Sequence, residues 1–287
     1  MKLFNQITLV GVGLLGGSLA RVCRERGLVG SIVGFGRNSA NLEQARELGV
    51  IDICAPDLSS AVENADLVVL CSPVGTIVSR VKEMLPSIKP GCIITDVGSV
   101  KAPLVRGIEA LVPKTVHYVG SHPIAGGEKS GLAASSSHLF QNAKCIVTPT
   151  PQTDAEALAR VSEFWQKVGM EVLTMNAEEH DYIFGAVSHL PHIVAYALMN
   201  TVGEISTKNY SQITSLSGQG FKDITRIAAS DPVMWRDICV SNKEPVLTLI
   251  DEFQSTLQRL KTWIEKEDAG ALEQTFEMAN KYRFNLI

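Results

Sequence analysis

Two histidine-containing segments of the sequence carry side chains that could act on a small organic substrate. The first is Ser121–Gly127, SHPIAGG, which follows a strand-like run and contains His122. A neutral imidazole can take the proton of a hydroxyl group while a hydride leaves the same carbon, as in alcohol oxidation. His122 is therefore a candidate general base, although a loop histidine is ordinarily one that only bonds to the backbone.

The second segment places His189 and His192 three residues apart in a helical pattern that Pro191 should kink. Two histidines at this spacing could bind zinc, but the site would need a third protein ligand. The nearby His180 and Asp181 fit the polar face of the same helix just as well. We therefore expect no metal site.

A glycine-rich loop lies near the start of the chain, between a predicted strand and a predicted helix. Residues 11–16 read GVGLLG. In this context Gly11 permits a tight turn, Gly13 lets the backbone approach a pyrophosphate and Gly16 lets the helix pack close to the strand. Glycine-rich turns also occur in other nucleotide folds and in methyltransferases, but the context favours a dinucleotide cofactor. The expected cofactor-binding residues are Gly11, Gly13, Leu14, Leu15 and Gly16, with Ser72 and Pro73 after a later strand.

The residues after the second predicted strand bear on the choice between NAD and NADP. An acidic residue roughly 20 residues beyond the glycine loop usually holds the ribose 2'-hydroxyl of NAD. Here that position is Gly36, followed by Arg37, Asn38 and Ser39. A guanidinium with small polar donors can bind a 2'-phosphate, whereas the alternative is a solvated arginine in a turn. The sequence thus favours NADP over NAD.

Short apolar runs alternate with amphipathic segments over the first part of the chain, which is typical of a parallel sheet covered by helices. The expected strands are Ile7–Val10, Ser31–Gly34, Leu67–Ser72, Cys92–Asp96, Tyr118–Ser121, Cys145–Thr148 and Val172–Thr174. The expected helices are Gly16–Arg26, Leu42–Leu48, Thr76–Leu85, Val100–Leu111 and Asp154–Val168. We expect an α/β, Rossmann-type, doubly wound parallel sheet over residues 1–176, followed by an all-helical dimerisation domain over residues 177–287.

Composition excludes several classes of partner. A chain of 287 residues with a net charge of -4 has no basic face for nucleic acid and no basic amphipathic helix for a membrane surface. No apolar run reaches the ~20 residues that span a bilayer, so we expect a cytoplasmic protein. The apolar fraction of 45% suggests an additional buried interface and hence a homodimer. Cys71, Cys92 and Cys145 lie in apolar stretches and are expected to be reduced thiols.

Taken together, the motifs closely resemble the prephenate/arogenate dehydrogenase family. The resemblance covers nearly the whole chain, through the Gly11 loop, Asp96–Lys101 (DVGSVK), Ser121–Gly126, Ser188–His192 (SHLPH) and Gly220–Arg226 (GFKDITR). It implies oxidative decarboxylation of prephenate in tyrosine biosynthesis. It also implies that His122 is the base at the substrate 4-hydroxyl, and that Ser99 orients this histidine and the nicotinamide.

The same resemblance implies a set of substrate-binding residues. His192 and Arg226 would bind substrate, with Arg226 holding a carboxylate through two hydrogen bonds. Glu128 and Asp223 would be acidic partners of this arginine, and Trp235 and His189 supporting residues that could reach across a dimer interface. A surface ion pair with Asp223 is the alternative for Arg226. Gly127 departs from the family, which often has a hydroxyl residue there.

Three other functions remain open at this stage. Arogenate carries an ammonium group where prephenate has a keto group, and Ser217–Gly220 (SGQG) lacks an acid to bind it, which favours prephenate. A hydroxyacid dehydrogenase would require a catalytic lysine in the helical domain, and Lys208 and Lys222 are not placed persuasively for that role. A redox-sensing dinucleotide-binding protein would leave His122, Ser99 and Arg226 unexplained.

Overall fold

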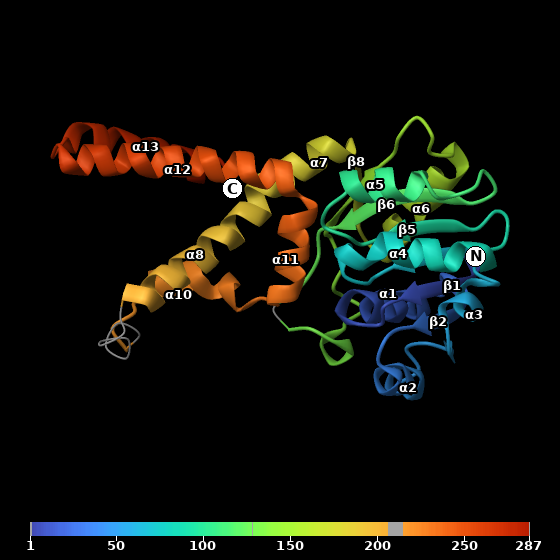
Figure 1. The fold of residues 1–287 in the computed structure, drawn as a ribbon. Coiled ribbons are helices and arrows are strands. Elements are labelled where there is room, and N and C mark those ends of the chain that lie inside the picture. Colours follow the sequence, from blue (N-terminus) through green and yellow to red (C-terminus); the bar gives the residue numbers. More distant parts are fainter. Residues whose placement is uncertain (1, 128, 206–214, 287) are drawn as a thin grey trace. The chain divides into compact units, whose positions relative to one another are not determined.

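The computed structural model describes residues 2–127, 129–205 and 215–286. The chain divides into two compact units, Met1–Asn242 and Lys243–Ile287. The first unit contains an eight-stranded sheet in the order β3-β2-β1-β4-β5-β6-β7-β8 (Figure 1). Its strands are β1 (Phe4–Val10), β2 (Val29–Phe35), β3 (Ile53–Cys54), β4 (Leu67–Leu70), β5 (Ile93–Asp96), β6 (His117–Pro123), β7 (Lys144–Thr148) and β8 (Glu171–Thr174).

The six neighbouring strands β3, β2, β1, β4, β5 and β6 are parallel, whereas β7 pairs antiparallel with β6 and parallel with β8. The expected Rossmann-type sheet is thus confirmed, with a mixed edge that the sequence did not indicate. The connecting helices are α1 (Leu14–Glu25), α2 (Ser39–Glu47), α3 (Leu58–Val62), α4 (Val74–Met84), α5 (Ala102–Glu109) and α6 (Ala155–Val168). The sequence analysis missed β3 and α3, because two and five residues are too short to show a period.

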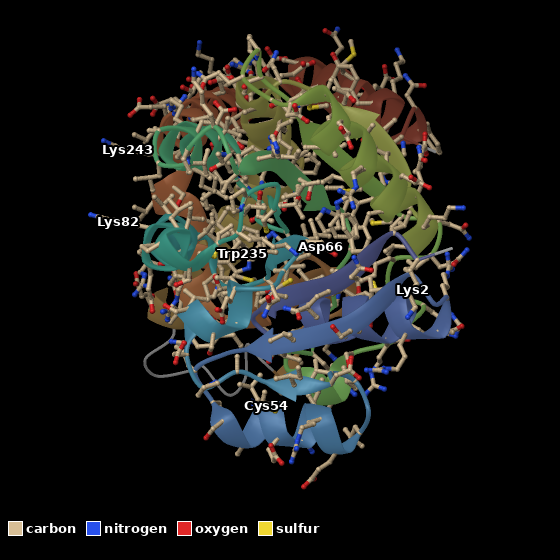
Figure 2. All side chains as sticks on the ribbon, turned by 90° about the vertical axis from the view of Figure 1, so that its right-hand side faces the viewer. Lys2, Cys54, Asp66, Lys82, Trp235 and Lys243 are labelled. Carbon is tan, nitrogen blue, oxygen red and sulfur yellow. The ribbon has the colours of Figure 1, made fainter. Side chains whose placement is uncertain are left out.

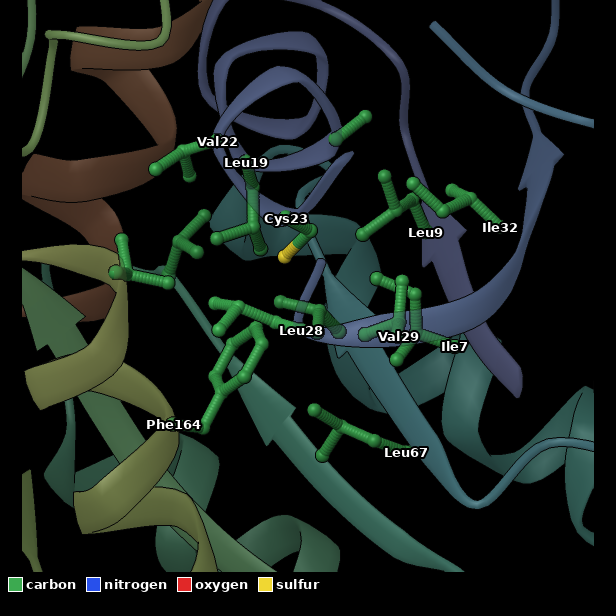
Figure 3. Close-up of a cluster of buried hydrophobic side chains, with 14 of the residues drawn as sticks. Ile7, Leu9, Leu19, Val22, Cys23, Leu28, Val29, Ile32, Leu67 and Phe164 are labelled. Carbon is green, nitrogen blue, oxygen red and sulfur yellow. The ribbon is translucent and has the colours of Figure 1, made fainter. Parts of the chain in front are cut away.

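Both faces of the sheet are buried, and alternate residues of the central strands belong to different cores. Ile7 and Leu9 of β1 join one cluster with α1 and Phe164 of α6, whereas Val10 joins the other cluster. Figure 3 shows the first cluster, in which Leu19 of α1 lies opposite the sheet. Because side chains alternate across a strand, this arrangement requires helices on both faces, which is the doubly wound architecture.

The helical part of the first unit follows β8. It comprises α7 (Ala177–Phe184), a π-helical segment (Gly185–His189), α8 (Leu190–Ile205), α10 (Gln219–Thr225), a short turn of helix (Arg226–Ala229) and α11 (Pro232–Ser241). Helix α7 packs against α5, and α11 against α4. In Figure 2, Lys82 of α4 extends into solvent, whereas Trp235 of α11 is buried. The second unit is a pair of helices, α12 (Lys243–Glu265) and α13 (Ala269–Phe284).

A π-helical segment directly precedes Pro191, at which the sequence predicts a kink. Proline lacks the N–H that would close an α-helical bond, and widening of the preceding turn accommodates this loss. The continuous stretch Ala177–Glu204 also has the length and hydropathy of a membrane span, contrary to our expectation, with 17% of its most apolar window buried. Core and interface helices have the same composition, and this one carries the buried, hydrogen-bonded His180 and Asp181.

Candidate functional site

The glycine loop connects β1 to α1, and two of its glycines are required by the local geometry. Gly11 has a φ of 109°, and a Cβ there would lie 2.7 Å from the carbonyl oxygen of Cys71. A Cβ on Gly16 would lie 2.0 Å from the carbonyl oxygen of Gly11. A Cβ on Gly13 would meet nothing within 4 Å, so the space in front of this residue is open. The loop can therefore accept a ligand against its backbone.

A pocket opens beside this loop at the carboxyl ends of β1, β2 and β4, where the strand order reverses. Such a reversal is the usual ligand site of open α/β sheets. Seven of the expected cofactor residues line it: Gly11, Gly13, Gly36, Arg37, Asn38, Ser72 and Pro73. The pocket is not lined by Leu14, Leu15, Gly16 and Ser39. Gly16 instead packs closely against the backbone of Gly11.

The end of the pocket near Gly36 contains two arginines. Arg37 is exposed, and Arg80 of α4 also lines the pocket, with its guanidinium carbon 5.8 Å from the centroid of the Phe35 ring. Asn38 is partly engaged, because its side chain accepts a hydrogen bond from the Asn41 N–H at 3.1 Å and caps α2. The sequence analysis missed Arg80, since nothing in its local pattern connects it with the turn at Gly36.

His122 lies near the end of β6, at the same edge of the sheet, and its ring is half-buried. Its Nδ1 lies 2.8 Å from Nε2 of His180, and its ring packs edge-on against Phe184 at a centroid distance of 4.8 Å. Burial lowers the pKa of His122 well below its usual range, and the nearby His180, Lys101 and His189 lower it further. The imidazole is therefore neutral at neutral pH, as a general base must be.

A buried ion pair between Lys101 and Asp96 fixes the backbone beside His122. Nζ of Lys101 also donates to the carbonyl oxygen of Ser121 at 2.8 Å, and Asp96 accepts from the Gly98 N–H at 2.8 Å. A buried charge without a partner is strongly destabilising, so each member holds the other in place. The pair thereby ties the 96–101 loop to the end of β6.

Ser99 lies in this loop and is half-buried. We expected it to orient His122; among the described residues, the hydrogen-bond partner of the imidazole is His180. The sequence analysis noted His180 and Asp181 only as a polar helix face. Asp181 accepts from the backbone N–H groups of Lys101 and Ala102, at 2.6 and 2.8 Å. This contact between residues far apart in sequence has no local signal.

His189 and His192 lie on either side of Pro191 and have different surroundings. Burial lowers the pKa of His189 to about 4, and its Nδ1 lies 2.9 Å from the amide nitrogen of Asn242. The Nε2 of His189 and the indole nitrogen of Trp235 are buried without a hydrogen-bond partner among the described residues. His192 stacks on Trp235 and is partly buried, which lowers its pKa. No cluster of three metal-ligating side chains occurs in residues 2–127, 129–205 and 215–286.

Arg226 lies close enough to His192 for its positive charge to lower the pKa of that histidine. The guanidinium is exposed at the start of the short helical turn after α10. Asp223 accepts a hydrogen bond from the side-chain amide of Gln219 at 2.7 Å. Glu128 lies outside the described residues. The structure thus brings together His192, the buried Trp235 and the exposed Arg226.

Comparison with known proteins gives matches over nearly the whole chain. The family model "Prephenate dehydrogenase, nucleotide-binding domain" matches residues 19–174, and "Prephenate dehydrogenase, dimerization domain" matches residues 176–278. A cyclohexadienyl dehydrogenase of Zymomonas mobilis is 35% identical, over 100% of this chain and 97% of its own length. A prephenate dehydrogenase of Bacillus subtilis is 37% identical, over 98% of this chain and 76% of its own length.

A solved structure is also similar. The crystal structure of prephenate dehydrogenase from Aquifex aeolicus, in complex with hydroxyphenyl propionate and NAD+, superposes with a TM-score of 0.92. The two chains are 40% identical, and the match covers 99% of this chain and 98% of the other.

Proposed function

The chain belongs to the prephenate dehydrogenase family, and from this premise we propose that it converts prephenate to 4-hydroxyphenylpyruvate and carbon dioxide. The enzymes of this family are oxidoreductases, and the bound nicotinamide of NAD(P)+ would accept a hydride from the ring carbon that bears the hydroxyl group. The observation that carries the assignment to this chain is the neutral imidazole of His122 at the ligand-binding edge of the sheet.

His122 takes the hydroxyl proton as the hydride leaves the same carbon. Loss of the hydride makes the ring electron-poor, and the carboxylate across the ring leaves as carbon dioxide, which makes the ring aromatic and the reaction irreversible. The task of the protein is to position the groups and to accept one proton. Ser99, in the loop tied to β6 by Lys101, would contact the nicotinamide side of the site.

The substrate carries carboxylates, and the surface formed by His192, Trp235 and Arg226 offers it a cation. Arg226 would hold one carboxylate through two hydrogen bonds, and His192 would contact the substrate beside it. His189 would support this surface, because its ring lies edge-on to Trp235 at a centroid distance of 6.0 Å. Asp223 and Glu128 would poise the arginine at the mouth of the site.

For the cofactor, we propose a preference for NADP over NAD. The position that would repel a 2'-phosphate if it were acidic is Gly36, and both Arg37 and Arg80 line the same end of the pocket. Asn38, the N-cap of α2, also lines the pocket and adds a polar group. These features support the preference, whereas the relative from Aquifex aeolicus was solved with NAD+.

The arogenate alternative is tested together with the cofactor. Initial rates with prephenate and arogenate, each with NAD+ and NADP+, give four values of kcat/KM. We expect the highest value for prephenate with NADP+. A higher value for arogenate would make the chain an arogenate dehydrogenase, and no turnover of either compound would refute the proposed function.

The two parts of the chain would have different tasks. Residues 1–176 would bind the nucleotide, and residues 177–287 would bind substrate and form a homodimer, in agreement with the names of the two matching family models. Helices α12 and α13 expose large apolar side chains, among them Leu257, Ile264 and Phe276. A second subunit would cover such a surface. We place the enzyme in the cytoplasm, where a soluble biosynthetic enzyme of this family would act.

A further inference from the structure

We propose that His180 and Asp181 are positioning residues that hold His122 in the single tautomer able to act as a base. The three side chains form a line from the start of α5 to the candidate base. His122 Nδ1 lies 2.8 Å from His180 Nε2, and His180 Nδ1 lies 2.8 Å from Oδ1 of Asp181. The inference rests on the proposed function in one respect only, the role of His122.

The direction of the hydrogen bonds follows from Asp181. Its two carboxylate oxygens accept the backbone N–H groups of Lys101 and Ala102, at the N-terminal end of α5. An ionised carboxylate has no proton to donate, so it can only accept. The proton in the bond between Asp181 and His180 must therefore be on Nδ1 of His180.

The position of the proton in the bond between His180 and His122 then follows as well. His180 is fully buried, and burial lowers its pKa, so the ring is neutral and Nε2 carries a lone pair. This lone pair can only accept, so Nδ1 of His122 is the donor. A neutral His122 with its proton on Nδ1 has its lone pair on Nε2. Nε2 is the nitrogen left to take a proton from substrate.

The same line of residues stabilises His122 after the proton has been transferred. The imidazolium would donate through Nδ1 to His180, whose own N–H points to the negative charge of Asp181. Lys101 and His189 oppose a positive charge on His122, as would a charge on His180 itself, and Lys101 is paired with Asp96. Phe184 packs on both imidazole rings, with centroids 4.8 Å from His122 and 4.5 Å from His180.

The tautomer can be measured without substrate. Nitrogen-15 NMR of the protein labelled in its six histidines distinguishes Nδ1–H from Nε2–H rings, and the His122→Asn spectrum assigns the His122 signals. We expect the Nδ1–H form for His122 in the wild type and a shift towards the Nε2–H form in His180→Phe. An Nε2–H ring in the wild type would overturn the proposal outright, even if His180→Phe did not fold.

Kinetics provide the second measurement. Partners that orient functional histidines are typically worth about 10- to 100-fold, so we expect His180→Phe to lower kcat by that amount with prephenate KM changed less than about 3-fold. His180→Gln offers an acceptor to His122 and should recover part of kcat, whereas the exposed His138→Gln is the matched control and should retain the wild-type rate. Wild-type kcat in His180→Phe, or loss confined to KM, would refute the positioning role. A wild type that shows the expected tautomer but does not turn over prephenate would instead refute the proposed function.

Discussion

The imidazole of His192 lies nearly parallel to the indole of Trp235, with ring centroids 3.5 Å apart and an angle of 21° between the planes. The Nδ1 of His192 donates to the carbonyl oxygen of Ser188 at 2.8 Å, so Nε2 is the nitrogen left for substrate. The stacking fixes the ring plane, and the hydrogen bond fixes its rotation. A substrate would therefore meet a preoriented histidine, with its lone pair on Nε2, beside Arg226.

Arg226→Ala should mainly weaken substrate binding, because the carboxylate is present in both the ground state and the transition state. Truncating one partner of a buried charge pair costs about 2–4 kcal/mol, which corresponds to a loss of roughly 30- to 1000-fold in kcat/KM. The measurement is steady-state kinetics, with Arg236→Ala as a control, since Arg236 is an exposed arginine paired with Asp237. Unchanged KM and kcat in Arg226→Ala would restrict this arginine to a surface role.

Gly36→Asp should shift the cofactor preference from NADP towards NAD, because a carboxylate at this position would repel a 2'-phosphate and bind a 2'-hydroxyl. The substitution should be tolerated, since the nearest neighbour of a Cβ there is a methyl group of Leu42 at 3.8 Å. Gly36→Ala separates the added charge from the added atoms and should leave the preference nearly unchanged. A wild type that already strongly favours NAD would contradict our interpretation of this turn.

Much of the fold was predictable because its signals are local. The apolar run at Leu67–Leu70 predicts a buried parallel strand, and the glycines at 11, 13 and 16 predict a turn between a strand and a helix. Two features of the sheet were not predicted because they leave no periodic pattern in the sequence. The strand Ile53–Cys54 has only two residues and no buried one, and the antiparallel pairing of β7 depends on the path of residues 124–143 rather than on any sequence period.

Residues of the candidate site could be predicted from the sequence only where they lie in a recognisable motif. His122, His192 and Arg226 lie in motifs, and the structure places His192 and Arg226 near one another. The contact of Asp181 with the start of α5 joins residues 79 and 80 positions apart, and only folding reveals it. Arg80 is similar, because it reaches the cofactor pocket from a helix whose sequence indicates only an amphipathic surface.

The protein should be a homodimer in solution, and its dimerisation should depend on apolar side chains of the second unit. Ile264 of α12 is 63% exposed, so Ile264→Asp should weaken dimerisation by placing a charge on a surface that a partner would cover. Sedimentation velocity at micromolar concentration measures the state, with the exposed Lys266→Asp as a control for added negative charge nearby. A monomeric wild type would disprove the dimer, and a dimeric Ile264→Asp variant would place the interface elsewhere.

Folding stability should fall on acidification because His189 is buried in its neutral form. Its folded-state pKa is about 4, below the ordinary value of about 6.5 expected in the unfolded chain. Between these values the unfolded state binds a proton that the folded state does not, so the free energy of unfolding rises with pH. This group should contribute about 1.4 kcal/mol per pH unit, and about 3 kcal/mol over the whole window.

Urea unfolding at fixed protein concentration, between pH 7.5 and 4.5, measures this contribution. The advantage of wild type over His189→Phe should shrink by about 1.4 kcal/mol per unit below pH 6.5, because the variant has no proton to bind. His138→Phe, at an exposed histidine, is the matched control. Parallel stability curves for wild type and His189→Phe would show that this ring does not carry the effect.

His122→Asn should retain the fold and cofactor binding but lose most of its turnover. Asparagine is polar and fits in the space of the imidazole, yet its amide cannot take a proton, and general-base catalysis is worth about 10²- to 10⁴-fold. We expect kcat to fall within that range, with a modest change in cofactor affinity measured by fluorescence titration. A variant with wild-type kcat would show that His122 is not the base.

The pH dependence of kcat/KM gives a sharper test of the same residue. Only neutral imidazole can take the proton, and burial together with His180, Lys101 and His189 holds the pKa of His122 well below the ordinary value of about 6.5. Raising the pH through neutrality should therefore leave the His122 contribution unchanged, and the rate should fall only when acid protonates the ring below pH 6.5. In His122→Asn this acidic limb should disappear, once the titration of prephenate itself has been subtracted. If the same limb persists in the variant, the proton is taken by another group, and His192, whose Nδ1 bonds to the carbonyl oxygen of Ser188, becomes the base to test next.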